Sequence, residues 1–190
     1  MSVTIPTRIP EGKISLTYED YVLLPNDRNR YEILEGELSV TPAPGTKHQT
    51  VSGNLFKALA RHVDERHLGS LFYAPVDLIL EPTSVLQPDL LFVSSARRSI
   101  ITERAVEGAP DLVVEIVSPT TSRNDRVTKA QIYARHAVPA YWIVDPEQES
   151  VEIYLLEGGG YRLVATLHGD NPQPAPPFEG LRLTPSSLFI

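Results

Sequence analysis

Two short apolar runs constrain the fold of this chain most, because each is joined to a carboxylate. The run at 90–93 (LLFV) follows Asp89, and the run at 112–117 (LVVEIV) contains Glu115. Short, nearly continuous apolar runs are typical of strands buried on both faces of a sheet. A buried carboxylate is costly unless it is paired or holds a metal. We therefore expect an ion pair or a cation site at Asp89 and Glu115.

The order of the predicted elements indicates one α/β domain over 1–190, with a central mixed sheet flanked by helices. A crossover from 112–117 to 140–145 would make these two strands parallel. We expect an irregular lead-in at 1–16 and a Pro-rich loop at 168–180. The other predicted elements are a short helix at 18–24, a hairpin of 30–34 and 37–40, helices at 46–67 and 123–136, a helical piece near 100–105, and strands at 71–73, 76–80, 151–156, 161–167 and 181–183.

Composition narrows the classes of ligand. The chain has no cysteine, and its five histidines lack metal-ligand spacing, so a metal would be held by oxygens, as magnesium, manganese and calcium are. The net charge of −7 argues against nonspecific coating of nucleic acid. The segment 123–136 is locally basic and could still meet one polyanion, although a solvated helix face explains it equally well. We find no apolar stretch of about 20 residues and no secretory signal, and expect a cytoplasmic protein that does not enter membranes.

Asp89, Glu115 and Lys129 together suit phosphodiester hydrolysis. Magnesium or manganese ions held by carboxylates from adjacent strands neutralise the phosphate and activate water. A lysine ammonium can stabilise the developing charge. Lys129 lies four residues before Tyr133, so that one face of the predicted helix would point toward the two acids.

Six motifs carry a resemblance to a known family. They are YEILEGE at 31–37, HQ at 48–49, QPDL at 87–90, EGAPDLVVEIVSP at 107–119, KAQIYAR at 129–135 and VPAYWIVDP at 138–146. In order and spacing they resemble the Uma family of endonucleases, over about 18–154. The resemblance implies a restriction-endonuclease-like fold with an added hairpin, a PD-(D/E)XK site and magnesium-dependent cleavage of nucleic acid, with DNA as the expected substrate.

The resemblance assigns roles residue by residue. Asp89 matches the aspartate of the Pro-Asp element, Glu115 the second acid, and Glu32 an amino-terminal acid that some members add to the metal site. Valine stands where the superfamily pattern expects lysine, and Lys129 on the next helix takes that place. His48 and Tyr133 match further family positions without an assigned role.

Each site residue also has a structural interpretation. Asp89 could cap a turn, and Glu115 could pair with Lys129 or an arginine. Lys129 could form an exposed helix pair with Asp125. Glu32 could face solvent, and His48 could pack or cap a helix.

Further residues are weaker candidates. Arg123 and Arg126 could contact phosphates, with Tyr133 as a further nucleic-acid contact. The hydroxyls at 118–122 would cap the basic helix, and Tyr141 and Trp142 belong to the core or to a subunit contact.

The leading hypothesis is a magnesium-dependent nuclease, and a homodimer would suit cleavage of both strands of a duplex. The second is an inactive nuclease-fold module that binds nucleic acid or protein. The third is a hydrolase acting on another phosphate or on a sugar, although the chain lacks the Gly-x-Ser-x-Gly elbow and the P-loop.

Overall fold

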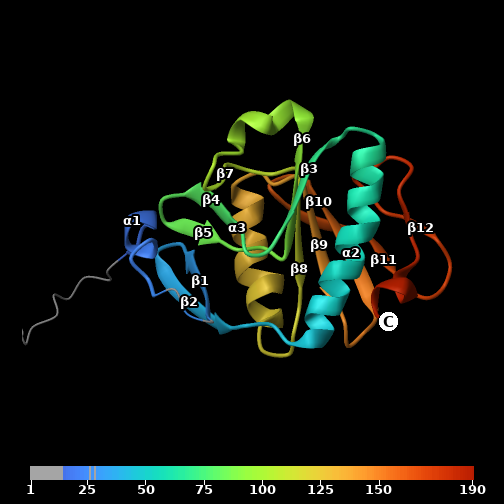
Figure 1. Ribbon diagram of the computed structural model, residues 1–190, viewed down its shortest axis with the longest axis horizontal. Helices are drawn as coiled ribbons and strands as arrows, with labels where there is room; N and C mark the ends of the chain where they lie inside the picture. Colours follow the sequence, from blue (N-terminus) through green and yellow to red (C-terminus); the bar gives the residue numbers. More distant parts are fainter. Residues whose placement is uncertain (1–14, 26, 28) are drawn as a thin grey trace, which may run out of the picture.

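The computed structural model describes residues 15–25, 27 and 29–190, and the expected lead-in at 1–16 falls almost wholly outside them. Two large β-sheets, a two-stranded sheet and their helices form the described part (Figure 1). The larger sheet has the order β11 (Gly160–Leu167), β10 (Ser150–Glu157), β9 (Ala140–Asp145), β8 (Leu112–Ile116), β6 (Leu90–Ser94) and β3 (Gly69–Tyr73). The smaller has the order β2 (Glu37–Pro42), β1 (Asn29–Leu34), β5 (Ser84–Leu86), β4 (Asp77–Glu81) and β7 (Ala105–Glu107).

Both sheets are mixed. The expected parallel pair is confirmed, since β8 runs parallel to β9 with Glu115 opposite Ile143. β4 and β7 form a second parallel pair, and β6 is the antiparallel neighbour of β8. The fold class, mixed α/β with sheets flanked by helices, is confirmed.

Two long helical segments cover opposite faces of the larger sheet. Helix α2 (Thr46–Glu65) buries the predicted apolar face against one side of β6, β8 and β9. The segment η2 (Asn124–Lys129), a π-helical turn, continues into α3 (Ala130–Arg135), which packs on the other side. Alternation along β8 turns Val113 and Glu115 toward α3, because successive side chains of a strand point to opposite faces. Glu115 therefore lies under the helix that carries Lys129.

Several elements differ from the expected ones. The helical piece near 100–105 is wrong: a 3₁₀ turn, η1 (Ser95–Ile100), precedes it, and β7 begins at Ala105. The strands expected at 71–73 and 76–80 lie in different sheets, so the described residues form two large sheets in place of one central sheet. The first helix, α1 (Tyr18–Tyr21), is shorter than expected. The Pro-rich segment pairs a short β12 (Gln173–Pro174) with β13 (Arg182–Leu183), and η3 (Pro185–Leu188) follows.

The described helices include none that is both long and apolar enough to cross a membrane. The predicted core residues Tyr141 and Trp142 are buried in β9, on opposite faces of the larger sheet. The hydroxyl of Tyr141 donates to the backbone oxygen of Asp125, at 2.9 Å, and so supports the π-helical turn from below.

Candidate active site

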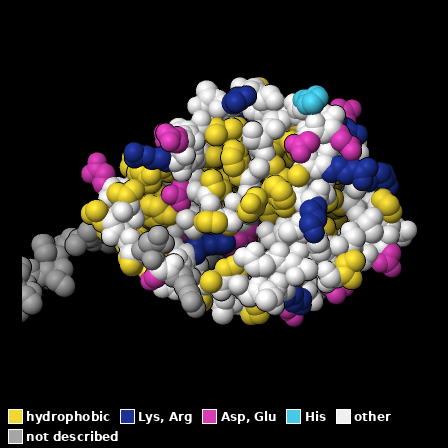
Figure 2. Space-filling view, viewed as in Figure 1, with side chains coloured by type: hydrophobic (Ala, Val, Ile, Leu, Met, Phe, Trp, Pro, Cys, Tyr) yellow, Lys and Arg dark blue, Asp and Glu magenta, His cyan; other side chains and the backbone are white. Residues whose placement is uncertain are grey.

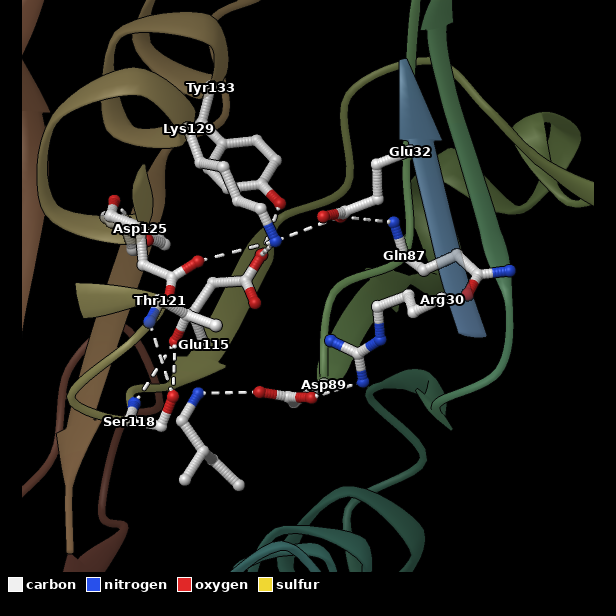
Figure 3. Close-up of polar contacts among 12 residues, drawn as sticks. Arg30, Glu32, Gln87, Asp89, Glu115, Ser118, Thr121, Asp125, Lys129 and Tyr133 are labelled. Carbon is white, nitrogen blue, oxygen red and sulfur yellow. Dashed lines mark hydrogen bonds and ion pairs between the residues drawn. The ribbon is translucent and has the colours of Figure 1, made fainter. Parts of the chain in front are cut away.

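A cluster of buried charges lies where the β1–β2 hairpin, the start of β6, strand β8 and the segment η2 meet (Figure 3). Four carboxylates and two cations make up its centre. They are Glu32 and Arg30 of β1, Asp89 before β6, Glu115 of β8, and Asp125 and Lys129 of η2. The structure thus brings together Asp89, Glu115, Lys129 and Glu32, the four residues expected to be catalytic.

Lys129 is the hub of this cluster. Its Nζ lies 2.9 Å from Glu32 Oε1, 3.2 Å from Glu115 Oε1 and 3.4 Å from Asp125 Oδ1. Burial alone would lower the pKa of Lys129, but the charges of Glu115 and Glu32 raise it above its ordinary value. The ammonium is therefore held in its charged form. The alternative of an exposed helix pair is wrong, because the Lys129 side chain is only 5% exposed.

Asp89 is held as an ionised carboxylate. Arg30 Nη2 donates to its Oδ1 at 2.8 Å, and the backbone N–H of Ile116 donates to its Oδ2 at 2.7 Å. His48 Nε2 lies 3.2 Å from the same Oδ2. Burial would raise the pKa of Asp89, but the His48 contact and the charge of Arg30 lower it to about 2. Asp89 thus joins β8 to the hairpin and to the first turn of α2.

The pKa of Glu115 is shifted in the opposite direction from that of Asp89. Burial raises its pKa well above the ordinary value, opposed by the charge of Lys129 and reinforced by Asp125 and Asp89. The hydroxyl of Tyr133 donates to Glu115 Oε1 at 2.7 Å. Tyr133 is itself fully buried, and a contact between this side chain and nucleic acid stays a prediction.

Two further carboxylates complete the cluster. Glu32 Oε1 also accepts the backbone N–H of Gln87 at 2.9 Å, and Glu32 is 2% exposed, so the alternative that it faces solvent is wrong. Asp125 lies one helical turn before Lys129, and burial raises its pKa although Lys129 lowers it. Both carboxylates share the one ammonium of Lys129.

A cavity of about 240 Å³ opens above these groups. Its floor holds the charged cluster and His48. Its walls come from β2 and the connection to α2 on one side, and from the loop before η2 and η2 itself on the other. The wall residues are Ser39, Thr41, Pro42, Ala43, Pro44 and Gly45, facing Ser118, Thr120, Thr121 and Asn124. The expected hydroxyl cap precedes the helix as a turn in which Ser118 and Thr121 bond each other's backbone N–H.

The two arginines expected to contact phosphates lie apart from this cavity. Arg126 pairs with Glu152 Oε2 at 2.7 Å and with Asp145 Oδ2 at 3.3 Å, on β10 and β9. Arg123 is exposed, and neither side chain belongs to the cavity lining. Phosphate contacts by Arg123 and Arg126 stay a prediction.

Sequence reasoning missed Arg30 and treated Asp125 only as a partner of Lys129. A signal for Arg30 was present, because it stands two residues before Glu32 and so shares its face of the strand. Asp125, Lys129 and Tyr133 are likewise spaced by four residues along one helical segment. The sequence did not reveal that this face of the strand and this face of the helical segment meet.

The donor chemistry of the site fits magnesium or manganese, which prefer oxygen ligands and are often held by one or two carboxylates plus substrate phosphate. The low pKa keeps Asp89 in the form that a cation needs. Among the described residues, no group of three or more His, Asp or Glu side chains is placed to hold a metal. A cation would therefore rest chiefly on two carboxylates and would compete with Arg30 and Lys129.

Known proteins resemble this chain in sequence and in fold. The family model Uma2, described as "Putative restriction endonuclease", matches residues 18–186. The crystal structure of "a putative nuclease belonging to DUF820" from Anabaena variabilis is similar with a TM-score of 0.74. It is 21% identical in sequence, and the match covers 92% of this chain and 97% of that one, which shows a shared fold. No curated protein matches the chain.

Proposed function

The chain belongs to the Uma2 family, "Putative restriction endonuclease", and on that premise we propose that it is a metal-dependent nuclease that hydrolyses phosphodiester bonds of nucleic acid, with DNA as the expected substrate. The observation that carries the proposal is the meeting of Asp89, directly before β6, and Glu115, on the neighbouring strand β8, at the floor of one cavity. Figure 3 shows these carboxylates, Lys129 and Arg30 around a common centre.

In this proposal Asp89 and Glu115 would hold magnesium or manganese, with Glu32 as a further acid beside them. When bound, such an ion neutralises the scissile phosphate and makes water a better nucleophile. Tyr133 and Lys129 hold one oxygen of Glu115, and Figure 3 shows the other turned toward Asp89.

The two cations would act on the substrate directly. Lys129 keeps a full positive charge beside the carboxylates, where it would stabilise charge that develops on the phosphoryl oxygens. Arg30 lies on the opposite side of Asp89 from Ile116, where its guanidinium would bind the phosphate of a substrate in the cavity.

One observation favours the second candidate, an inactive module that binds nucleic acid or protein. Arg30 and Lys129 already neutralise part of the acidic cluster, so the protein does not need a bound metal ion in order to fold. A buried charge cluster that is satisfied by its own ion pairs can be purely structural.

Manganese titration calorimetry and cleavage assays distinguish the nuclease from the inactive module. We expect the parent protein to bind Mn²⁺ and to cut nucleic acid, and Asp89→Asn and Glu115→Gln each to lower the rate at least a hundredfold. The matched controls are Asp145→Asn and Glu152→Gln, because these acids pair with Arg126 outside the cavity. Parental cleavage by the two site variants would refute the assignment, and folded protein without Mn²⁺ binding would favour the module.

A further inference from the structure

The shape of the cavity bears on the substrate. Resting on the proposed function, we propose that the site accepts a single nucleic-acid strand, either free or at an unpaired end, and does not accept an intact duplex. Three observations carry this inference: the depth of the reactive groups, the fixed position of the walls and the charge of the rim.

The carboxylates lie deep in a small cavity. Asp89 and Glu115 are 2% and 1% exposed, and the cavity of about 240 Å³ is smaller than pockets that enclose a drug-sized ligand, about 300–1,000 Å³. A phosphate with its sugar can enter such a space. A double helix is far larger than this volume, so in our proposal a strand brings its phosphate to the carboxylates without its partner strand. Figure 2 looks onto the hollow, in which basic and acidic side chains lie together beside the hairpin.

The wall formed by the β1–β2 hairpin is anchored at both ends. At its tip, the backbone of Gly36 bonds to Leu16 at 2.9 Å and to Thr83 at 2.8 Å. At its base, Arg30 binds Asp89 and Glu32 binds Lys129, across the cavity. Widening the mouth for a duplex would break buried ion pairs, which is costly when charges are left unpaired.

The charge of the site is unsuited to a duplex backbone. Proteins that hold duplex DNA neutralise several phosphates with Lys and Arg. Here the cations that line the cavity, Arg30 and Lys129, already bind carboxylates, and the exposed rim residues are uncharged: Pro42, Ala43, Gly45, Thr120 and Asn124. Lys47, one residue into the helix beyond this rim, pairs with Glu147 at 2.7 Å. This arrangement of charges suits the entry of one phosphate at a time.

The test uses the full chain and fluorescein-labelled oligonucleotides of one sequence, as a single DNA strand, its duplex, a forked duplex and the RNA strand. Cleavage is followed with Mn²⁺, and binding by anisotropy with Ca²⁺. We expect the single strands to be bound and cut at least tenfold better than the duplex, and the fork to be cut only in its arms. The DNA and RNA arms identify which strand is preferred.

The outcomes distinguish this inference from the proposed function. Equal or better cutting of the intact duplex overturns the inference and leaves the nuclease in place. Preferential binding of the strand without cutting supports the inference and refutes the nuclease. Binding of neither form overturns both.

A pair of glycines tests whether the strand enters this mouth. A β-carbon at Gly45, on the rim, or at Gly53, on α2 outside the lining, would meet no atom within 4 Å. We expect Gly45→Phe to weaken binding of the single strand at least fivefold and Gly53→Phe to leave it unchanged, with both proteins folded by circular dichroism. Equal affinities of the two variants would overturn entry through this mouth.

Discussion

The ammonium of Lys129 lies 2.9 Å from Oε1 of Glu32, and this contact joins a helical segment of the second half of the chain to a hairpin near its beginning. The same ammonium also holds Glu115 and Asp125. Carboxylates from three elements therefore share one buried positive charge. The stability of the fold and the chemistry of the site depend on the same side chain.

Lys129→Met should destabilise the protein strongly. The change leaves Glu32, Glu115 and Asp125 buried without their shared cation, and removal of one partner of a buried pair costs about 3–5 kcal/mol. Urea unfolding can be followed through the fluorescence of the single, buried tryptophan, Trp142. The control is Lys47→Met, which removes an exposed pair with Glu147 and should cost less than about 1 kcal/mol. Equal midpoints for the two variants would contradict the hub role.

Gly36→Ala should loosen the hairpin that carries Arg30 and Glu32. Gly36 has φ +83°, and an added β-carbon would overlap the Ser15 side chain. Gly159 has φ +85° but open space around it, so Gly159→Ala reports the cost of the backbone conformation alone, about 1 kcal/mol. We expect Gly36→Ala to lower the free energy of unfolding by more than Gly159→Ala does. Equal losses of unfolding free energy in the two variants would mean that the Ser15 side chain moves aside at no energetic cost.

Most of the fold was predictable because hydrophobic patterns report local structure. The apolar runs at 90–93 and 112–117 became the buried strands β6 and β8, and the apolar face of 46–67 became that of α2. The three-residue strand β5 was missed because such a segment is too short to show a period. The helical piece near 100–105 was wrong because Thr102 Oγ1 accepts the backbone N–H of Ala105, which turns the chain into β7.

The site was predictable only in part. Glu115 was anomalous from its neighbours alone, since a carboxylate in an apolar strand requires a partner. Lys129 and Tyr133, its partners in the described part of the chain, lay on the helix face that pointed toward it. The pairing of Arg30 with Asp89 depends on how the hairpin packs on the larger sheet, which no local pattern reveals.

Asp89 should make stability depend on pH in the acid range. Its pKa is about 2 in the folded protein and 3.8 as the ordinary value, so the unfolded chain binds the proton more readily. Stability from this group is complete above about pH 4 and is lost as pH falls toward 2, by about 2 kcal/mol in all. Urea midpoints between pH 5 and 2.5 should fall less steeply for Asp89→Asn than for the parent. Asp64→Asn, at an exposed position of α2, is the control and should follow the parent.

Tyr133→Phe should weaken the binding of the metal ion without leaving a cavity in the core. The variant keeps the ring against Tyr141 but loses the donor to Glu115 Oε1, which leaves Lys129, among the described residues, to orient that carboxylate. Loss of a residue that orients a metal ligand typically costs 10–100-fold in affinity, so we expect the Mn²⁺ Kd from calorimetry to rise about tenfold.

The control for this variant is Tyr161→Phe, whose lost hydroxyl binds the Val138 carbonyl outside the cavity. Each change removes one internal hydrogen bond and should cost about 1 kcal/mol of stability. Only Tyr133→Phe should also shift the Mn²⁺ Kd, because only its hydroxyl touches Glu115. If both variants bind Mn²⁺ as the parent does, Tyr133 does not position the carboxylate. If both lose affinity equally, the effect follows from general destabilisation, and Glu115 is then oriented by Lys129 alone.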